Sequence, residues 1–192
     1  MSQGAERHRM SVAEYLAFER EAREKHQYVR GEVFAMAGAS VRHNRIVARL
    51  IFQLGRGLGD GPCQVFASDL KVHVASLDTF TYPDLSIFCG PPALYEGSTD
   101  VVTNPKVLFE VLSEPTERYD RVEKAEGYRA IPSLDDHLFV DQKKAHVEHY
   151  ARRPDDAWTL REAGPGGTIT IASVGVTLDV DAIYAGVFAL PA

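Results

Sequence analysis

Residues 106–112 read KVLFEVL, and this stretch decides the fold. Such a near-continuous apolar run is typical of a strand that is buried on both faces in the middle of a sheet. Glu110 is the exception within it. A carboxylate in that environment costs several kcal/mol unless a cation or a strong hydrogen-bond donor lies opposite. The stretch therefore predicts a central strand and also marks a position where chemistry could take place.

The elements after this strand predict a parallel crossover. Residues 117–131 are typical of a helix, which Pro132 ends, and residues 137–141 (HLFVD) are typical of the next strand. A strand, helix, strand order of this kind joins parallel neighbours. The remaining chain predicts strands at residues 145–151, 158–162 and 168–176, with a short helix at 181–187.

The elements before the central strand begin with a helix at residues 11–23, where Ser11 and Glu14 form a capping box. A strand at 32–36 and a periodic helix at 41–57 follow. Strands at 64–74 and 80–88 are expected to be antiparallel neighbours, joined by a turn at 76–79, and residues 90–105 an exposed loop. One face of the 41–57 helix is apolar, and the opposite face carries Arg42, Arg45, Arg49 and Arg56.

These elements predict an α/β fold with a mixed central β-sheet flanked by helices and with additional antiparallel strands. Residues 1–10 are expected to be a flexible tail, and residues 11–192 a single domain. The composition agrees with a globular protein, since 45% of the residues are hydrophobic and 25% are charged. No run approaches the roughly 18 apolar residues of a membrane span.

The cysteines and the net charge bear on location and partner. Cys63 and Cys89 match no metal-binding spacing, so free thiols and a cytoplasmic, reducing location are expected. The formal net charge of −6 argues at first against a polyanionic partner. This argument is weaker if a metal ion offsets acids at one site and if arginines gather on one helix face.

Asp84 is a second acid in an apolar strand. Two carboxylates from neighbouring strands would repel each other unless a cation lies between them, and ligation by oxygen alone suits Mg²⁺ or Mn²⁺. Asp120, Lys124 and Tyr128 recur every four residues on the following helix, so Lys124 can point back toward the strand ends. A surface ion pair between Asp120 and Lys124 is the simpler interpretation of that spacing.

An ordered set of motifs runs through the chain from about residue 11 to about residue 187: HQYVRGEV (26–33), AMAGAS (35–40), HNRI (43–46), FASDLKV (66–72), PD (83–84), EVLS (110–113), DRVEK (120–124) and VEHY (147–150). The set resembles the PD-(D/E)XK nuclease superfamily in its Uma-type, restriction-endonuclease-like branch. The resemblance implies a restriction-endonuclease-like core in the order αβββαβ. It also implies metal-dependent hydrolysis of phosphodiester bonds in DNA.

The resemblance implies roles for particular residues. Asp84 and Glu110 would hold Mg²⁺ or Mn²⁺, and Lys124 would orient the attacking water, because Leu112 occupies the usual lysine position. Glu32 is the expected additional acid, and His43 is a weaker candidate. The family often carries an acid where this chain has Gln27. A homodimer is expected, with no organic cofactor and no membrane partner, and the expected contacts to nucleic acid come from Arg42, His43, Arg45 and Arg49.

Other interpretations stay open at this point. The fold could have lost catalysis and serve as a nucleic-acid-binding or oligomerising module. The acids and Lys124 could form only a buried ion-pair network, with no room for a metal. The arginines could be an ordinary solvated helix face. In an alternating strand His146 and Glu148 share one face and His149 the other, which favours a solvated strand face over a metal site.

Overall fold

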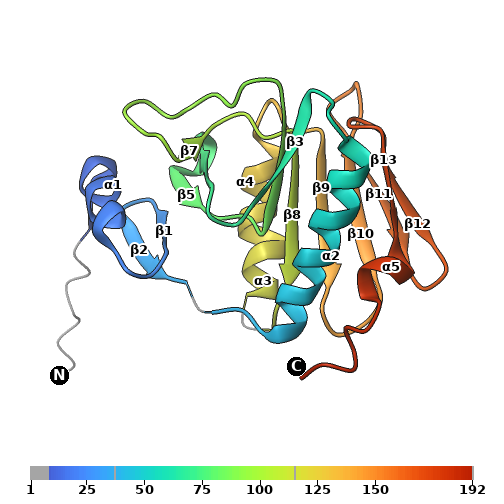
Figure 1. Ribbon diagram of the computed structural model, residues 1–192. Helices are drawn as coiled ribbons and strands as arrows, with labels where there is room; N and C mark the ends of the chain where they lie inside the picture. The colour runs from blue at the N-terminus through green and yellow to red at the C-terminus, as the bar shows by residue number, and fades with distance from the viewer. Residues whose placement is uncertain (1–8, 37, 115, 192) are drawn as a thin grey trace.

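The computed structural model describes residues 9–36, 38–114 and 116–191 and contains a central six-stranded sheet (Figure 1). Its order is β11-β10-β9-β8-β6-β3. The strand β8 (Val107–Leu112) is buried along its whole length, antiparallel to β6 (Leu85–Cys89) and parallel to β9 (Asp136–Asp141). The predicted central strand and the parallel crossover are therefore confirmed. The other strands are β3 (Cys63–Ala67), β10 (Val147–Arg152) and β11 (Trp158–Ala163).

A second, five-stranded sheet has the order β2-β1-β5-β4-β7. Its strands are β1 (His26–Val29), β2 (Glu32–Ala35), β4 (Lys71–Val74), β5 (Thr79–Thr81) and β7 (Val101–Val102). The helix α1 (Val12–Glu21) begins at the predicted capping box. Most of the predicted tail, residues 1–8, lies outside the described residues, and the Met10 amide donates a hydrogen bond to the Gly31 carbonyl oxygen.

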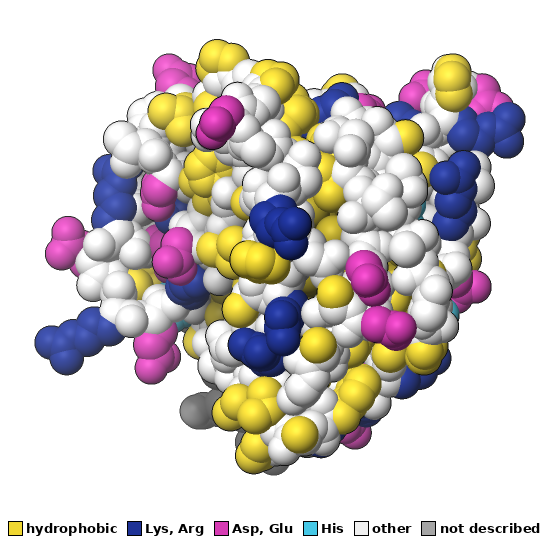
Figure 2. Space-filling model, turned by 45° about the vertical axis from the view of Figure 1, so that its right-hand side comes forward, with side chains coloured by type: hydrophobic (Ala, Val, Ile, Leu, Met, Phe, Trp, Pro, Cys, Tyr) yellow, Lys and Arg dark blue, Asp and Glu magenta, His cyan; other side chains and the backbone are white. Residues whose placement is uncertain are grey.

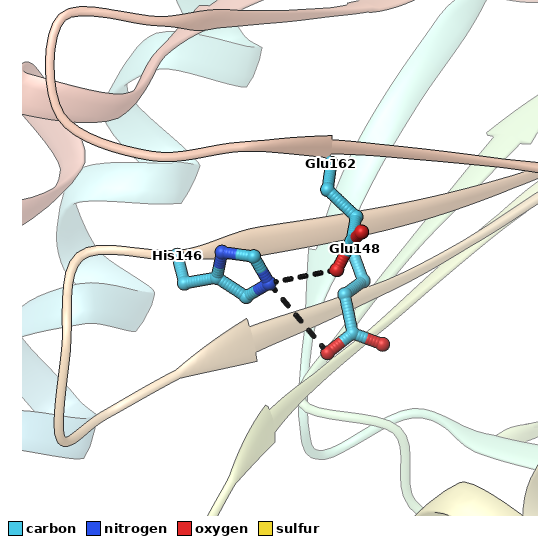
Figure 3. Close-up of side chains that lie close together, drawn as sticks. All are labelled: His146, Glu148 and Glu162. Atoms are coloured by element: carbon cyan, nitrogen blue, oxygen red, sulfur yellow. Dashed lines mark hydrogen bonds and ion pairs between the residues drawn. The ribbon is translucent and has the colours of Figure 1, made fainter.

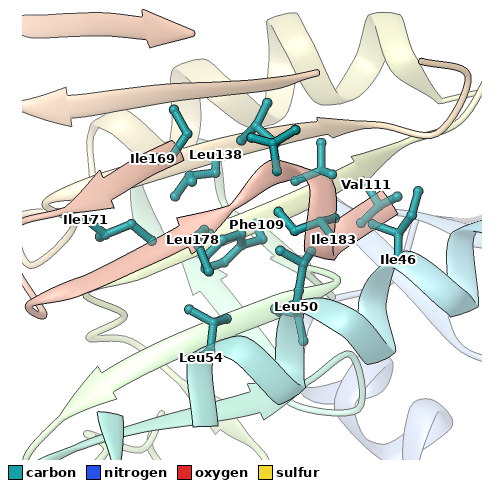
Figure 4. Close-up of a cluster of buried hydrophobic side chains, with 14 of the residues drawn as sticks. Ile46, Leu50, Leu54, Phe109, Val111, Leu138, Ile169, Ile171, Leu178 and Ile183 are labelled. Carbon is teal, nitrogen blue, oxygen red and sulfur yellow. The ribbon is translucent and has the colours of Figure 1, made fainter. Parts of the chain in front are cut away.

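One face of the central sheet is covered by α2 (Val41–Leu58) and by the C-terminal elements (Figure 4). Ile46, Leu50 and Leu54 on α2 are fully buried, as their spacing of four residues requires. They pack in one cluster with side chains of the strands and of the C-terminal hairpin, such as Phe109 and Leu178. The hairpin consists of β12 (Thr168–Ile171) and β13 (Val176–Asp179), and α5 (Val180–Tyr184) follows it.

The other face is covered by a helix with three segments. These are α3 (Glu117–Tyr119), the π-helical turn η2 (Asp120–Lys124) and α4 (Ala125–Arg129). Tyr128 is fully buried on this face with Leu108 and Val72. Gly127 lies so close to the second sheet that a Cβ atom there would be 2.9 Å from a methyl carbon of Val74. The helix is therefore held tightly between the sheets.

Three predicted strands have the wrong bounds, because each covers parts of two separate strands. Residues 64–74 form β3 and β4, residues 80–88 form β5 and β6, and residues 168–176 hold β12 and the start of β13. Pro83 interrupts the second of these, since it lacks the N–H group that a ladder needs. The chain thus leaves the central sheet after β3, enters the second sheet as β4 and β5, and returns as β6. The predicted loop at 90–105 also holds the buried strand β7.

The expected free thiols are wrong. Cys63 and Cys89 are joined in a disulfide, with their Cα atoms 3.9 Å apart. They lie directly opposite each other in the β3–β6 register, a pairing that their separation of 26 residues does not reveal. Among the described residues, no helix has the length and apolar character needed to cross a membrane.

Candidate active site

A cavity of about 390 Å³ opens beside the end of β8. Asp84, Glu110 and Lys124 line it together with His43 of α2 and Gln27 of β1. The three residues that the sequence linked through burial and helical spacing therefore meet at one place, although they come from three separate segments of the chain.

Asp84 lies where the chain passes from β5 to β6, just after Pro83 and outside both strands. Its Oδ2 atom accepts a hydrogen bond of 2.7 Å from the Val111 amide of β8 and lies 3.2 Å from His43 Nε2. Within the part of the chain that the structure describes, neither contact involves Oδ1. One carboxylate oxygen thus anchors Asp84, and the other remains available to the cavity.

Glu110 faces the helical layer because strand alternation places it on the same side as Leu108 and Leu112. Its Oε1 atom accepts hydrogen bonds from Tyr128 Oη at 2.7 Å and from Lys124 Nζ at 3.1 Å. Neither of these hydrogen bonds involves Oε2. Burial raises the pKa of Glu110 to about 8, an effect that Lys124 opposes and that Asp120 and Asp84 strengthen.

Lys124 is buried between two carboxylates, Glu110 and Asp120, and lies 3.0 Å from Asp120 Oδ1. Burial alone would lower the pKa of Lys124, but the two acids outweigh it and hold the pKa above the usual value. The interpretation of Asp120 and Lys124 as a surface pair is therefore wrong. Both residues lie on η2, and π-helical turns are frequent at functional sites.

Asp120 also lines the cavity, and the sequence did not identify it as a site residue. The available signal was its position one turn before Lys124. The sequence prediction used this spacing to place Lys124 near the strand ends but did not extend the argument to Asp120.

Glu32 is not brought to the site, so its assignment as the additional acid is wrong. It lies at the turn end of the β1–β2 hairpin, opposite Val29, and its Oε1 atom is 3.9 Å from an Arg9 guanidinium nitrogen. From this hairpin Gln27 and Ala35 line the cavity, and Gln27 Oε1 accepts a hydrogen bond from Thr81 Oγ1. The hairpin thus presents an amide, and no carboxylate, to the cavity.

The arginines of α2 are placed differently from one another. Arg42 donates to the Leu190 carbonyl oxygen at 2.8 Å, and Arg49 donates to that of Ala185 at 3.4 Å, so both bind the C-terminal segment. Arg45 is exposed. Figure 2 shows the basic side chains of that view as separate spots among hydrophobic and acidic ones. The helix therefore does not present its arginines as one free stripe.

The donor set fits a divalent cation. Asp84, Glu110 and Asp120 bring three carboxyl groups to the cavity against the single ammonium group of Lys124, and a bound cation would favour the ionised form of Glu110. Oxygen ligands with room for water are what Mg²⁺ and Mn²⁺ prefer. Lys124 binds Glu110 and Asp120 but makes no ion pair with Asp84 among the described residues, and the cavity is open. A closed ion-pair network without room for a metal is therefore not what the structure contains.

The chain has a nuclease-like fold. Residues 12–181 match the Uma2 family model, which is described as "Putative restriction endonuclease". The chain belongs to this family, and the fold class predicted from the resemblance is confirmed.

The chain has similar proteins in cyanobacteria. It is 35% identical over 178 residues to the uncharacterized protein slr1290 of Synechocystis sp., covering 93% of each chain. It is 37% identical over 153 residues to the uncharacterized protein sll1609 of the same organism, covering 80% of this chain and 86% of the other. A crystal structure of "a putative nuclease belonging to DUF820" from Anabaena variabilis superposes with a TM-score of 0.73, covers 93% of this chain and 99% of that one, and is 15% identical. At this level of sequence identity the comparison shows a common fold.

Proposed function

We propose that the protein is a metal-dependent nuclease that hydrolyses phosphodiester bonds in DNA, with Mg²⁺ or Mn²⁺ held by Asp84 and Glu110. The observation that carries this proposal is the pair of carboxylates that share one cavity with Lys124, each with one oxygen outside its hydrogen bonds to the described residues. The family membership supports the nuclease class.

The residues around the cavity have separate roles in this proposal. A bound divalent ion would neutralise charge on the scissile phosphate and lower the pKa of a coordinated water. Lys124, held between two carboxylates, acts as a charged donor that orients the water and stabilises developing negative charge. Asp120 positions Lys124. The Val111 amide and His43 hold Asp84 in place.

Cleavage of supercoiled plasmid DNA tests the proposal. We expect the wild-type protein to cut with Mg²⁺ or Mn²⁺, and Asp84→Ala, Glu110→Gln and Lys124→Met each to lower the rate at least about 100-fold. Glu123→Gln is a matched control, because Glu123 is an exposed acid on the same helical turn as Lys124. The catalytic assignment fails if no metal supports cleavage, or if Asp84→Ala cuts as fast as wild type.

Gln27 favours one second candidate, a nuclease fold that binds nucleic acid or oligomerises without catalysis. An amide carries no charge to offset a metal ion, so a cavity with Gln27 has one carboxylate fewer than a site with an acid there. Calorimetric titration with Mn²⁺ separates the two functions. Binding that is absent or millimolar, and that Glu110→Gln leaves unchanged, would favour the inactive module.

We also propose that the protein acts as a homodimer, because nucleases of the superfamily it resembles that cut duplexes commonly pair two sites. Light scattering at micromolar concentration is expected to give twice the chain mass of 21.2 kDa. A mass of one chain would refute this part of the proposal and leave the single-site chemistry unaffected.

A further inference from the structure

His146, Glu148 and Glu162 form a second cluster of metal-binding groups (Figure 3), and none of them lines the candidate active-site cavity. His146 Nε2 lies 3.1 Å from Glu162 Oε1 and 3.9 Å from Glu148 Oε1. One ligand atom from each residue lies within 4.8 Å of the other two. The three side chains therefore converge on one point of the sheet.

Strand pairing explains why they converge. Glu148 on β10 and Glu162 on β11 are directly opposite each other in the antiparallel register. His146 lies just before β10 and, two residues from Glu148, faces the same side. Two like charges directly opposite each other destabilise a sheet unless a cation offsets them. This arrangement needs positive charge.

The cation already present offsets only part of that charge. Arg121 binds both oxygens of Glu148 at 2.8 Å and also binds Glu117. Glu148 therefore shares this guanidinium with Glu117, whereas Glu162 pairs with His146 and makes no ion pair with Arg121 among the described residues. The three acids outnumber the one guanidinium. The sequence interpretation of a solvated strand face is therefore wrong for Glu148, whose exposed fraction is only 9%.

The spacing of the ligand atoms fits a small transition-metal ion. Bonds of about 2.0–2.1 Å from a tetrahedral zinc ion place ligand atoms about 3.4 Å apart, and the two distances from His146 Nε2, 3.1 and 3.9 Å, lie on either side of that value. An imidazole nitrogen favours such an ion over Mg²⁺ or Ca²⁺. A carboxylate has about four lone-pair sites, so Glu148 can bind an ion while Arg121 keeps its hydrogen bonds.

We propose that His146, Glu148 and Glu162 bind a divalent transition-metal ion of the Zn²⁺ type, with a fourth position open to water. Arg121 holds Glu148 in the orientation that binding requires. This site is independent of the proposed nuclease function and of the ion assigned to Asp84 and Glu110.

Calorimetric titration with Zn²⁺ alone tests the site on the full chain. We expect His146→Gln and Glu162→Gln each to weaken one binding event at least tenfold, and Glu110→Gln to leave that event unchanged. The imidazole NMR signals of His146 are expected to shift on addition of Zn²⁺ in both the wild type and the Glu110→Gln variant. Binding of an ion at the candidate active site would instead be weakened by Glu110→Gln and left unchanged by His146→Gln and Glu162→Gln.

The control is Glu126→Gln, which removes an exposed acid outside the cluster. Glu162 is exposed too, so its variant is expected to fold, and a urea denaturation curve checks this. The proposal is overturned if His146→Gln and Glu162→Gln bind Zn²⁺ with the stoichiometry and affinity of Glu126→Gln, or if the His146 signals do not move.

Discussion

Lys124 Nζ lies 3.1 Å from Glu110 Oε1, and their side chains are only 6% and 3% exposed. Removing one partner of such a buried pair leaves an uncompensated charge. We expect Lys124→Met to lower the free energy of unfolding by about 3–5 kcal/mol in urea denaturation without metal.

The double variant Lys124→Met/Glu110→Gln is the matched control for this loss. Neutralising both partners removes the charge on Glu110 and leaves only Asp120 without its cation, so the double variant is expected to lose less stability than the two single variants together. Strict additivity would show that the two residues do not stabilise each other.

Gln27→Glu is expected to strengthen metal binding at the candidate active site. The new carboxylate keeps the acceptor for Thr81 and adds a charged oxygen at the cavity. We expect the Kd for Mn²⁺ to fall about tenfold in calorimetry, since ligand charge tunes the affinity of oxygen sites. An unchanged Kd would mean that the ion binds elsewhere.

His137 makes the protein sensitive to acid. It is fully buried, neither ring nitrogen has a hydrogen-bond partner among the described residues, and burial lowers its pKa from 6.5 to about 3. A depressed histidine pKa means that the unfolded chain takes up the proton first, so stability is lost as the pH falls below 6.5. Between pH 8 and pH 5 the contribution of His137 to this loss is about 2 kcal/mol.

The comparison for His137 is His137→Leu, which has no group to protonate. Urea denaturation at both pH values is expected to give a smaller difference in unfolding free energy for this variant than for wild type, by about 2 kcal/mol. Equal differences would contradict the assignment.

Gly127→Ala is expected to destabilise the fold by about 1–3 kcal/mol, because the new methyl group would be 2.9 Å from the nearest methyl carbon of Val74. Gly55→Ala is the control. Gly55 lies in α2, where an added Cβ has no neighbour within 4 Å, so alanine should raise stability by about 0.5–1 kcal/mol. Thermal unfolding distinguishes the two. A Gly127→Ala variant as stable as wild type would show that α4 can move away from β4.

Arg45→Ala tests the contact to nucleic acid. Arg45 is the exposed member of the predicted set, whereas Arg42 and Arg49 bind carbonyl oxygens of the C-terminal segment. The logarithm of the DNA-binding constant falls linearly with the logarithm of the salt concentration. If Arg45 contacts one phosphate, its loss should make this slope less steep by about 0.9. Arg161→Ala, at an exposed position on β11, should leave the slope unchanged. Equal slopes for wild type and Arg45→Ala would exclude that contact.

The central part of the fold could be predicted because its signals are local. Unbroken burial identifies β8, and a period of about four residues identifies α2. The break at residue 83 had a local signal in Pro83, which the strand prediction did not use. Near residue 68 β-branched residues continue after the break, and only the pairing partners show that the chain changes sheets. The same limit explains the disulfide and the proximity of Glu162 to His146. Both depend on the register between paired strands, which the spacing of residues along the chain does not give.

The same distinction between local signals and pairing across the fold applies to the residues of the candidate site. Asp84, Glu110 and Lys124 stand out as charges within apolar patterns, and the structure brings them together. Glu32 was a wrong choice because a two-residue shift along β1 and β2 moves a side chain from the cavity to the hairpin turn. The arginines of α2 share one face as predicted, but their spacing does not show that the C-terminal segment lies against them.

The disulfide makes the segment between residues 63 and 89 a covalently closed ring that passes through both sheets. β3 and β6 hold the ring in the central sheet, and β4 and β5 hold it in the second. A ring of this size lowers the entropy of the unfolded chain by an amount worth about 3–4 kcal/mol. Asp84 lies on this ring, so the cross-link restrains the segment that carries a candidate metal ligand even when the sheets separate.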